Sequence, residues 1–135
     1  MNLVVVDASA YVYATTSKEP AARVLRERMT DAVCHVPHLL DAEVGNVLRR
    51  LELRGEIPPK VAQASLDSLE DVVDQRYPAT GPLKTMAWQL RGGISYYDGL
   101  YAALAVAIGA PLVTGDARLS RAPELPCEIE LVGQS

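Results

Sequence analysis

The stretch 95–119 constrains the fold more than any other part of this chain. It begins with a helix-start signal at Ser95 and continues as an apolar, alanine-rich segment as far as Gly109. Glycine commonly ends helices because it adopts the left-handed backbone conformation at little cost. A short apolar run at 112–114 follows at once. We therefore predict a buried helix over about residues 97–108 that leads directly into a strand, a connection typical of α/β folds.

The rest of the chain alternates in the same way between helical patterns and short apolar strands. The β-branched run at 3–6 predicts a strand that is buried on both faces, as in a parallel sheet. The segment 76–82 contains two prolines and a glycine and is therefore expected to be a loop. No repeat or linker interrupts the pattern, so we predict one α/β domain, 1–135, with a mostly parallel sheet. Further strands are expected near 32–36 and 128–132, and helices near 10–14, 20–29, 39–54, from 58 onward, and 83–90.

Composition and charge exclude some function classes and leave others open. The chain has 135 residues and a formal net charge of −4. An acidic chain binds nucleic acid poorly through non-specific contacts, but a divalent cation held by clustered acids reverses the local charge. No apolar run is long enough to cross a bilayer and no signal-peptide pattern opens the chain. Cys34 and Cys127 do not have metal-site spacing, so we expect reduced thiols in a cytoplasmic protein without membrane contact.

Four acidic residues are not explained by the packing of their neighbours. Asp7 and Asp116 follow predicted strands, and Asp98 begins the helix at 97–108. Strand ends and helix starts meet at one edge of a parallel sheet. Glu43 falls on the inward stripe of the helix at 39–54, where a carboxylate is costly unless it is paired. Two structural alternatives stay open here, because Asp7 could cap the next helix and Glu43 could pair with a neighbouring arginine or backbone group.

Gathered at one edge, these carboxylates would repel one another unless a cation neutralised them. Oxygen ligands favour Mg²⁺ or Mn²⁺, which lowers the pKa of a bound water and neutralises a phosphate in the transition state. The chemistry implied is hydrolysis of a phosphodiester. A zinc site is less suited, since His35 and His38 are the only histidines. No glycine-rich phosphate loop with its lysine is present.

Three segments carry a resemblance to a known family. They are VVDAS at 5–9, PHLLDAEVGNVLRR at 37–50 and SYYDGLYAALAVAIGAPLVTGDARL at 95–119. In these the chain resembles PIN-domain ribonucleases, specifically the VapC-type toxins of bacterial toxin–antitoxin pairs. The resemblance implies an α/β/α sandwich that cleaves RNA with Mg²⁺, a VapB-type antitoxin as partner, and a homodimer. It also implies that Asp7, Glu43, Asp98 and Asp116 form the catalytic metal site, with Asp7 and Asp98 as the first direct ligands, and that Ser9, Asn46 and Thr114 orient the carboxylates and water.

The chain departs from the family pattern at two positions, and the resemblance also predicts where its partners bind. Gly99 stands where the family usually has alanine, which we expect to loosen the start of that helix. Arg118 occupies a place where some PIN domains carry a further acid, so a second tightly held metal is not expected. We expect the antitoxin to lie along 37–54 with a basic side chain toward the acids, and the dimer to form through 39–69. Candidate RNA contacts are Arg49, Arg50, Arg54, Lys84, Arg91, Arg118 and Arg121, with Tyr96 and Tyr97 as stacking residues.

Two other functions compete with the ribonuclease. One is a PIN-like binding module of weak or lost activity, against which the presence of all four acids counts. The other is a phosphotransfer protein, such as a phosphatase or receiver domain, with Asp7 as covalent acceptor. Such a protein would need a second acid or a lysine next to that aspartate, and neither is evident. Covalent phosphorylation of Asp7 would favour this last reading.

Overall fold

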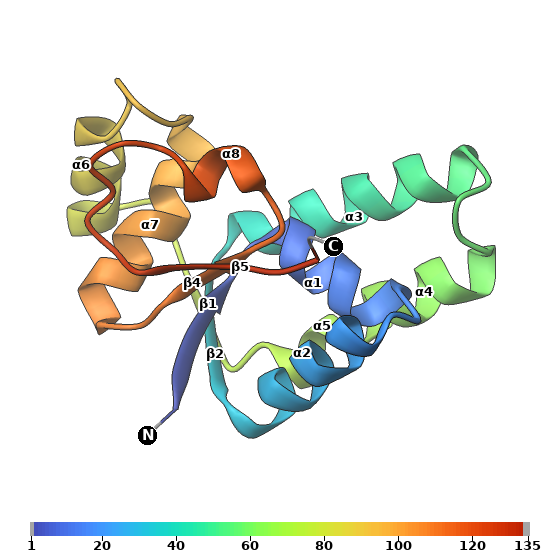
Figure 1. Ribbon diagram of the computed structural model, residues 1–135. Coiled ribbons are helices and arrows are strands. Elements are labelled where there is room, and N and C mark those ends of the chain that lie inside the picture. The colour runs from blue at the N-terminus through green and yellow to red at the C-terminus, as the bar shows by residue number, and fades with distance from the viewer. Residues whose placement is uncertain (1, 134–135) are drawn as a thin grey trace.

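The computed structural model describes residues 2–133 and has a five-stranded, all-parallel sheet at its centre. The strand order is β3-β2-β1-β4-β5, so the first strand of the chain lies in the middle (Figure 1). The α/β fold with a parallel sheet is thus confirmed. The strands are β1 (Leu3–Val6), β2 (Val33–Pro37), β3 (Gln75–Tyr77), β4 (Leu112–Thr114) and β5 (Ile129–Leu131).

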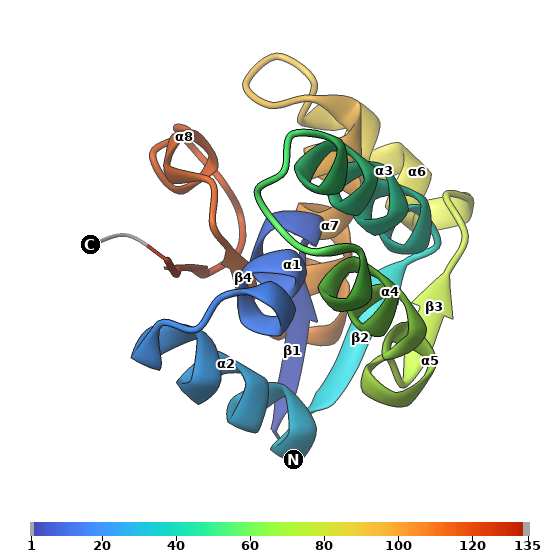
Figure 2. The ribbon, with the colours of Figure 1, turned by 90° about the vertical axis from the view of Figure 1, so that its right-hand side faces the viewer.

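Helices cover both faces of the sheet, which makes the α/β/α sandwich that we expected. Helices α6 and α7 lie on one face, and α1 to α5 lie on the other (Figures 1 and 2). None of the helices in residues 2–133 is long and apolar enough to span a membrane. The helices are α1 (Ala8–Thr16), α2 (Pro20–Asp31), α3 (Leu39–Leu53), α4 (Pro59–Asp67), α5 (Leu69–Val72), α6 (Gly81–Gln89), α7 (Tyr96–Ile108) and α8 (Ala117–Ser120).

The core forms where β1 and α7 bury their side chains. Val4, Val5 and Val6 are fully buried, as expected for a central parallel strand with helices on both faces. Helix α7 is buried along residues 99–105 and ends at Gly109, whose φ of 67° is left-handed. The helix–glycine–strand unit is therefore confirmed, with the helix starting one residue earlier than predicted.

The loop predicted at 76–82 is wrong at both ends, because Arg76 and Tyr77 belong to strand β3 and Gly81 and Pro82 begin helix α6. This edge strand pairs in parallel with β2, His35 opposite Gln75 and Pro37 opposite Tyr77. Arg76 also donates from Nε to Asp41 Oδ2 on α3 at 2.6 Å. Pairing with a neighbouring strand, rather than an apolar pattern of its own, makes this segment a strand.

The expected loosening at Gly99 is not what the structure shows. A Cβ atom at Gly99 would lie 3.0 Å from the carbonyl oxygen of Ala87 on α6. Glycine therefore permits the close packing of α6 against α7 at this point. It also brings the first turn of α7, which carries Asp98, into a rigid pair of helices.

Candidate active site

Asp7 is the most enclosed of the four predicted acids, with 6% of its surface exposed. It directly follows β1, and its Oδ1 accepts hydrogen bonds from Ala10 N at 2.9 Å and Ser9 Oγ at 2.7 Å. Its Oδ2 accepts a hydrogen bond from the Thr114 hydroxyl. Asp7 therefore does cap α1, as the structural alternative expected. The same carboxylate also lies at the predicted site, so the two roles are combined.

Ser9 and Thr114 tie the end of β1 to the end of β4. Ser9 Oγ accepts a hydrogen bond from Gly115 N at 2.8 Å, and Thr114 Oγ1 accepts one from Asp116 N at 3.0 Å. Each hydroxyl thus donates to Asp7 and accepts from the segment that carries Asp116. This geometry suits the orienting role that the resemblance implied for Ser9 and Thr114.

Asp116 caps the short helix α8. Its Oδ1 accepts from the backbone N–H groups of Arg118 at 2.9 Å and Leu119 at 3.4 Å. Arg118 Nε lies 3.8 Å from the same oxygen, but the arginine side chain is 88% exposed. Such an exposed pair contributes little energy, so this carboxylate remains accessible to other cations.

Asp98 lies in the first turn of α7 and faces Asp116 across a cleft. The cleft has a volume of about 240 Å³ and is lined by both carboxylates together with Ser95 and Arg118. Ser95 caps the helix, because its Oγ accepts a hydrogen bond from Asp98 N at 3.1 Å. The predicted helix-start signal is confirmed, and it fixes the backbone of Asp98.

Glu43 reaches the site from α3 and has a partner that the sequence did not suggest. The hydroxyl of Tyr101 donates to Glu43 Oε1 at 2.6 Å, and Tyr101 itself is 1% exposed. Tyr101 lies three residues after Asp98, hence on the same side of α7, which is the signal that could have pointed to it. Asn46 is exposed one turn after Glu43, and within residues 2–133 it makes no hydrogen bond to the four acids. Its role stays a prediction.

Asp98 is electrostatically coupled to each of the other three acids, and Asp7 is coupled to Glu43. Burial raises the pKa of Asp7, against the hydrogen bonds from Thr114, Ser9 and Ala10 N, and the Asp98 charge raises it further. Burial also raises the pKa of Glu43, with smaller contributions from Asp98 and Asp7. The pKa of Asp98 is raised by burial and by Asp116, and lowered by Ser95 and Arg118. The structure thus places Asp98 of α7 near each of the other three predicted acids, which come from the end of β1, from α3 and from the end of β4.

These carboxylates lack cationic partners of their own. Among the described residues, Asp116 alone of the four forms an ion pair, with the exposed Arg118. Within 2–133, no three His, Cys, Asp or Glu side chains are arranged so that they could hold a metal ion between them. Mg²⁺ commonly binds through one or two carboxylates and keeps several waters. A donor set of oxygen atoms around a cleft suits that mode of binding.

Comparison of the sequence with known proteins identifies the family of this chain. The PIN domain model matches residues 4–125. The chain is 50% identical over 132 residues to ribonuclease VapC1 of Mycobacterium tuberculosis, covering 98% of this chain and 99% of the relative. It is 36% identical over 131 residues to ribonuclease VapC9 of the same species, with coverage of 96% and 98%.

Solved structures share the fold at low sequence identity. The crystal structure of VapBC2 from Rickettsia felis bound to a promoter DNA fragment superposes with a TM-score of 0.69 at 17% identity, over 96% of this chain and 98% of that one. VapC20 of Mycobacterium tuberculosis, a sarcin-ricin loop cleaving toxin, gives 0.64 at 16% identity, over 87% and 92%. With the sequence matches, these results show that the chain belongs to the PIN-domain family and, within it, to the VapC ribonucleases.

Proposed function

We propose that this protein is an endoribonuclease toxin that hydrolyses RNA phosphodiester bonds with Mg²⁺, for which Mn²⁺ can substitute. The observation that carries the proposal is the charge of the site. The charge of Asp98 raises the pKa of Asp7 and of Glu43, and the charge of Asp116 raises the pKa of Asp98. Within residues 2–133, none of Asp7, Glu43 and Asp98 has a lysine or arginine as an ion-pair partner. A divalent cation is the group that would relieve this repulsion.

Asp7 and Asp98 would hold the metal directly, and Glu43 and Asp116 would act through its waters. When bound, the metal would supply a water of lowered pKa and neutralise charge on the phosphate. The chain's own contribution is positioning. Ser9 and Thr114 fix both oxygens of Asp7, and Tyr101 fixes one oxygen of Glu43. Such hydrogen bonds keep ligating carboxylates in the required orientation.

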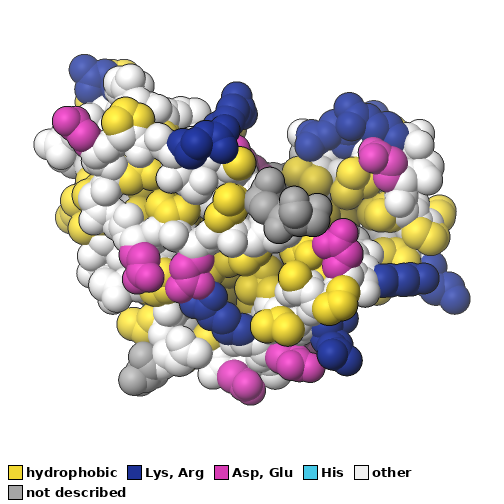
Figure 3. All heavy atoms as spheres, viewed as in Figure 1, with side chains coloured by type: hydrophobic (Ala, Val, Ile, Leu, Met, Phe, Trp, Pro, Cys, Tyr) yellow, Lys and Arg dark blue, Asp and Glu magenta, His cyan; other side chains and the backbone are white. Residues whose placement is uncertain are grey.

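RNA would lie in the hollow above these acids. Figure 3 shows the surface hollowed between the side that carries α8 and the side that carries α3 and α4, with Lys and Arg side chains on both. Arg49 and Arg50 are exposed on α3, and Arg118 and Arg121 are exposed at α8. These cations would contact the phosphates that flank the scissile bond.

A VapB-type antitoxin is the proposed protein partner. The superposed structures include VapBC2 from Rickettsia felis and VapBC from Salmonella typhimurium, both bound to DNA. We expect the antitoxin to run along 37–54 and to bring a basic side chain to the acids, because the site lacks such a charge. A homodimer through 39–69 and a single domain over 1–135 remain part of the proposal. Free thiols at Cys34 and Cys127 support a cytoplasmic setting.

The competing functions fit the geometry less well. A binding module would not need four coupled acids at one edge of the sheet. A phosphotransfer protein would need a second acid or a lysine next to Asp7, whereas the groups that contact this carboxylate are the hydroxyls of Ser9 and Thr114 and the backbone N–H of Ala10. The site therefore favours hydrolysis over phosphotransfer to Asp7.

The experiment is cleavage of a labelled, structured RNA by the purified protein in Mg²⁺ and in EDTA. Asp98→Asn removes a carboxylate of the site and should abolish cleavage. The matched control is Asp41→Asn, because Asp41 lies on the same helix as Glu43 but pairs with Arg76. Cleavage that persists in EDTA, or in Asp98→Asn, contradicts the proposal.

A further inference from the structure

The segment 75–97 differs in charge from the rest of the chain. The chain as a whole carries 17 acidic and 13 basic residues, yet 75–97 contains no Asp or Glu and includes Arg76, Lys84 and Arg91. The segment also holds the only tryptophan, Trp88. The segment ends directly before Asp98, and because Arg76 pairs with Asp41 on α3, Lys84 and Arg91 are its exposed cations.

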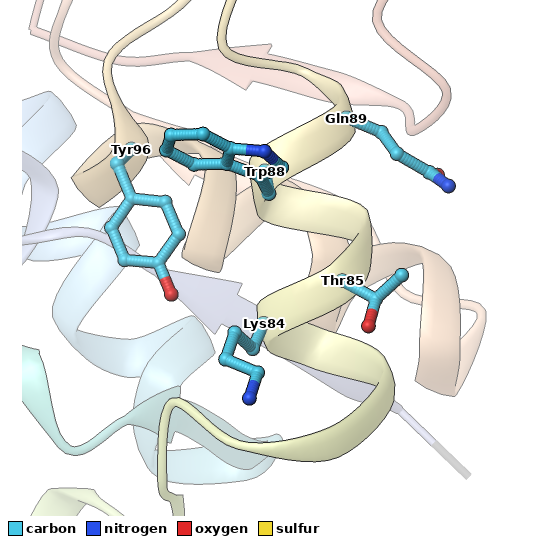
Figure 4. Close-up of a pocket in the computed structure, with 5 residues that line it drawn as sticks. All are labelled: Lys84, Thr85, Trp88, Gln89 and Tyr96. Atoms are coloured by element: carbon cyan, nitrogen blue, oxygen red, sulfur yellow. The ribbon is translucent and has the colours of Figure 1, made fainter.

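An open pocket of about 540 Å³ lies on this surface. It is lined by Lys84, Thr85, Trp88 and Gln89 of α6 and by Tyr96 at the start of α7. Figure 4 shows the Tyr96 ring beside Trp88, with its hydroxyl directed toward the side of the pocket where Lys84 lies. The lining contains two aromatic rings, one cation and two neutral polar groups, and no acid.

The two aromatic residues are held in place although Trp88 is exposed and Tyr96 is only half-buried. The ring centroids of Trp88 and Tyr96 lie 6.4 Å apart in an edge-to-face arrangement. The guanidinium carbon of Arg91 lies 4.4 Å from the Trp88 ring centroid, and Arg91 Nη1 donates to Trp88 O at 2.8 Å. Trp88 is nevertheless 57% exposed. A large aromatic side chain that is fixed and yet exposed is typical of a recognition surface.

We propose that this pocket binds one unpaired nucleotide of the RNA substrate, with its base stacked on Trp88 and its phosphate near Lys84. Exposed aromatic rings flanked by cations are the usual means of holding unpaired bases, and the volume is in the range of small-ligand sites. Tyr96 and Asp98 both lie in the first turn of α7 but two residues apart, so they point to different sides of the helix, and the nucleotide would flank the cleavage site. The inference rests on the proposed ribonuclease function and identifies where part of the substrate would bind.

The single tryptophan makes a direct test available. The protein is titrated in EDTA, where the proposed mechanism predicts no hydrolysis, with an unlabelled single-stranded RNA of eight mixed nucleotides. We expect saturable quenching of the Trp88 fluorescence, with the same midpoint as the fluorescence anisotropy of the labelled RNA. Trp88→Leu should weaken binding by about 5- to 100-fold, which corresponds to one lost base–aromatic stack, and Trp88→Phe by much less.

Charge variants test the phosphate contact separately. Lys84→Ala should reduce the salt dependence of binding by about 0.7 in the log–log slope, the value for one phosphate of a single strand. Lys60 is exposed at the start of α4, so Lys60→Ala is the matched control and should leave the slope unchanged. Because the side chains exchanged here are exposed, the variants are expected to fold.

Several results would contradict the proposal that this pocket binds RNA. RNA binding without quenching, with an unchanged dissociation constant in Trp88→Leu, places the RNA elsewhere. The absence of any RNA binding would also contradict the proposal. If Trp88→Leu turns a dimer into a monomer in sedimentation but binds RNA normally, a second copy occupies the surface instead. Quenching without cleavage in Mg²⁺ would refute the ribonuclease proposal alone, so the two failures are distinguishable.

Discussion

Tyr101→Phe removes one hydroxyl from the candidate site and leaves the buried ring in place. In the wild type this hydroxyl donates to Glu43 Oε1 at 2.6 Å. The hydrogen bond lowers the pKa of Glu43 against the larger effect of burial, which raises it. The variant therefore leaves a half-buried carboxylate without its donor, and the pKa of Glu43 should rise further.

The magnitude follows from the charge and burial of the pair. A hydrogen bond to a charged group contributes about 1.5–3 kcal/mol, and water can replace part of it at a half-buried carboxylate. We expect a loss of about 1–2 kcal/mol at neutral pH, which for a chain of this size lowers the Tm by about 4–7 °C. The loss should shrink below the ordinary Glu pKa of 4.5, where Glu43 is neutral in both proteins.

The assay is urea unfolding in EDTA at about pH 7 and about pH 4, with the double-mutant cycle to Glu43→Gln. Tyr97→Phe is the matched control, because Tyr97 is on the same helix and 57% exposed, and it should change stability by less than about 0.5 kcal/mol. An equal loss at both pH values, or no coupling between Tyr101 and Glu43, would refute the assigned role of the hydroxyl.

Two further predictions concern packing and charge. Gly99→Ala places a Cβ 3.0 Å from the carbonyl oxygen of Ala87 and should reduce the free energy of unfolding, measured by urea titration, by about 1–3 kcal/mol. The control is Gly92→Ala, which should be near neutral because a Cβ added at Gly92 meets no neighbouring heavy atom within 4 Å. If the two substitutions changed the free energy of unfolding equally, α6 and α7 could move apart at no cost in stability, which would contradict this prediction. The raised pKa of Asp7 contributes stability below the ordinary value of 3.8, and this contribution is lost as pH rises through the folded-state pKa. Without metal, Asp7→Asn should therefore gain stability relative to the wild type between about pH 4 and about pH 8 in thermal unfolding, and a constant difference would contradict this.

Much of the site could be predicted because the relevant patterns are local. A β-branched run followed by Asp7, and a glycine stop before the strand that precedes Asp116, identify strand ends directly in the sequence. Parallel strands then bring those ends to one edge of the sheet. Glu43 could be singled out because it interrupts an apolar stripe.

Other features depend on contacts between distant segments. Tyr101 and Glu43 are separated by 58 residues, and an apolar helix gives no sign of which hydroxyl meets a carboxylate. Strand β3 has no apolar pattern, and its conformation depends on pairing with β2. The effect of Gly99 could be judged only once α6 was known to pack against it.

The central claim is that four carboxylates form one Mg²⁺ site, and Mg²⁺ binding tests it without knowledge of the RNA. The measurement is the rise in Tm on titration with Mg²⁺ for the wild type and for Asp7→Asn, Glu43→Gln, Asp98→Asn and Asp116→Asn. At a concentration ten times the dissociation constant, binding stabilises the wild type by about 1.4 kcal/mol, or about 5 °C.

We predict that this shift is lost in Asp7→Asn and Asp98→Asn, is reduced in Glu43→Gln and Asp116→Asn, and is retained in the control Asp41→Asn. A wild-type response in all four variants, or the same loss in Asp41→Asn, would contradict the four-carboxylate site.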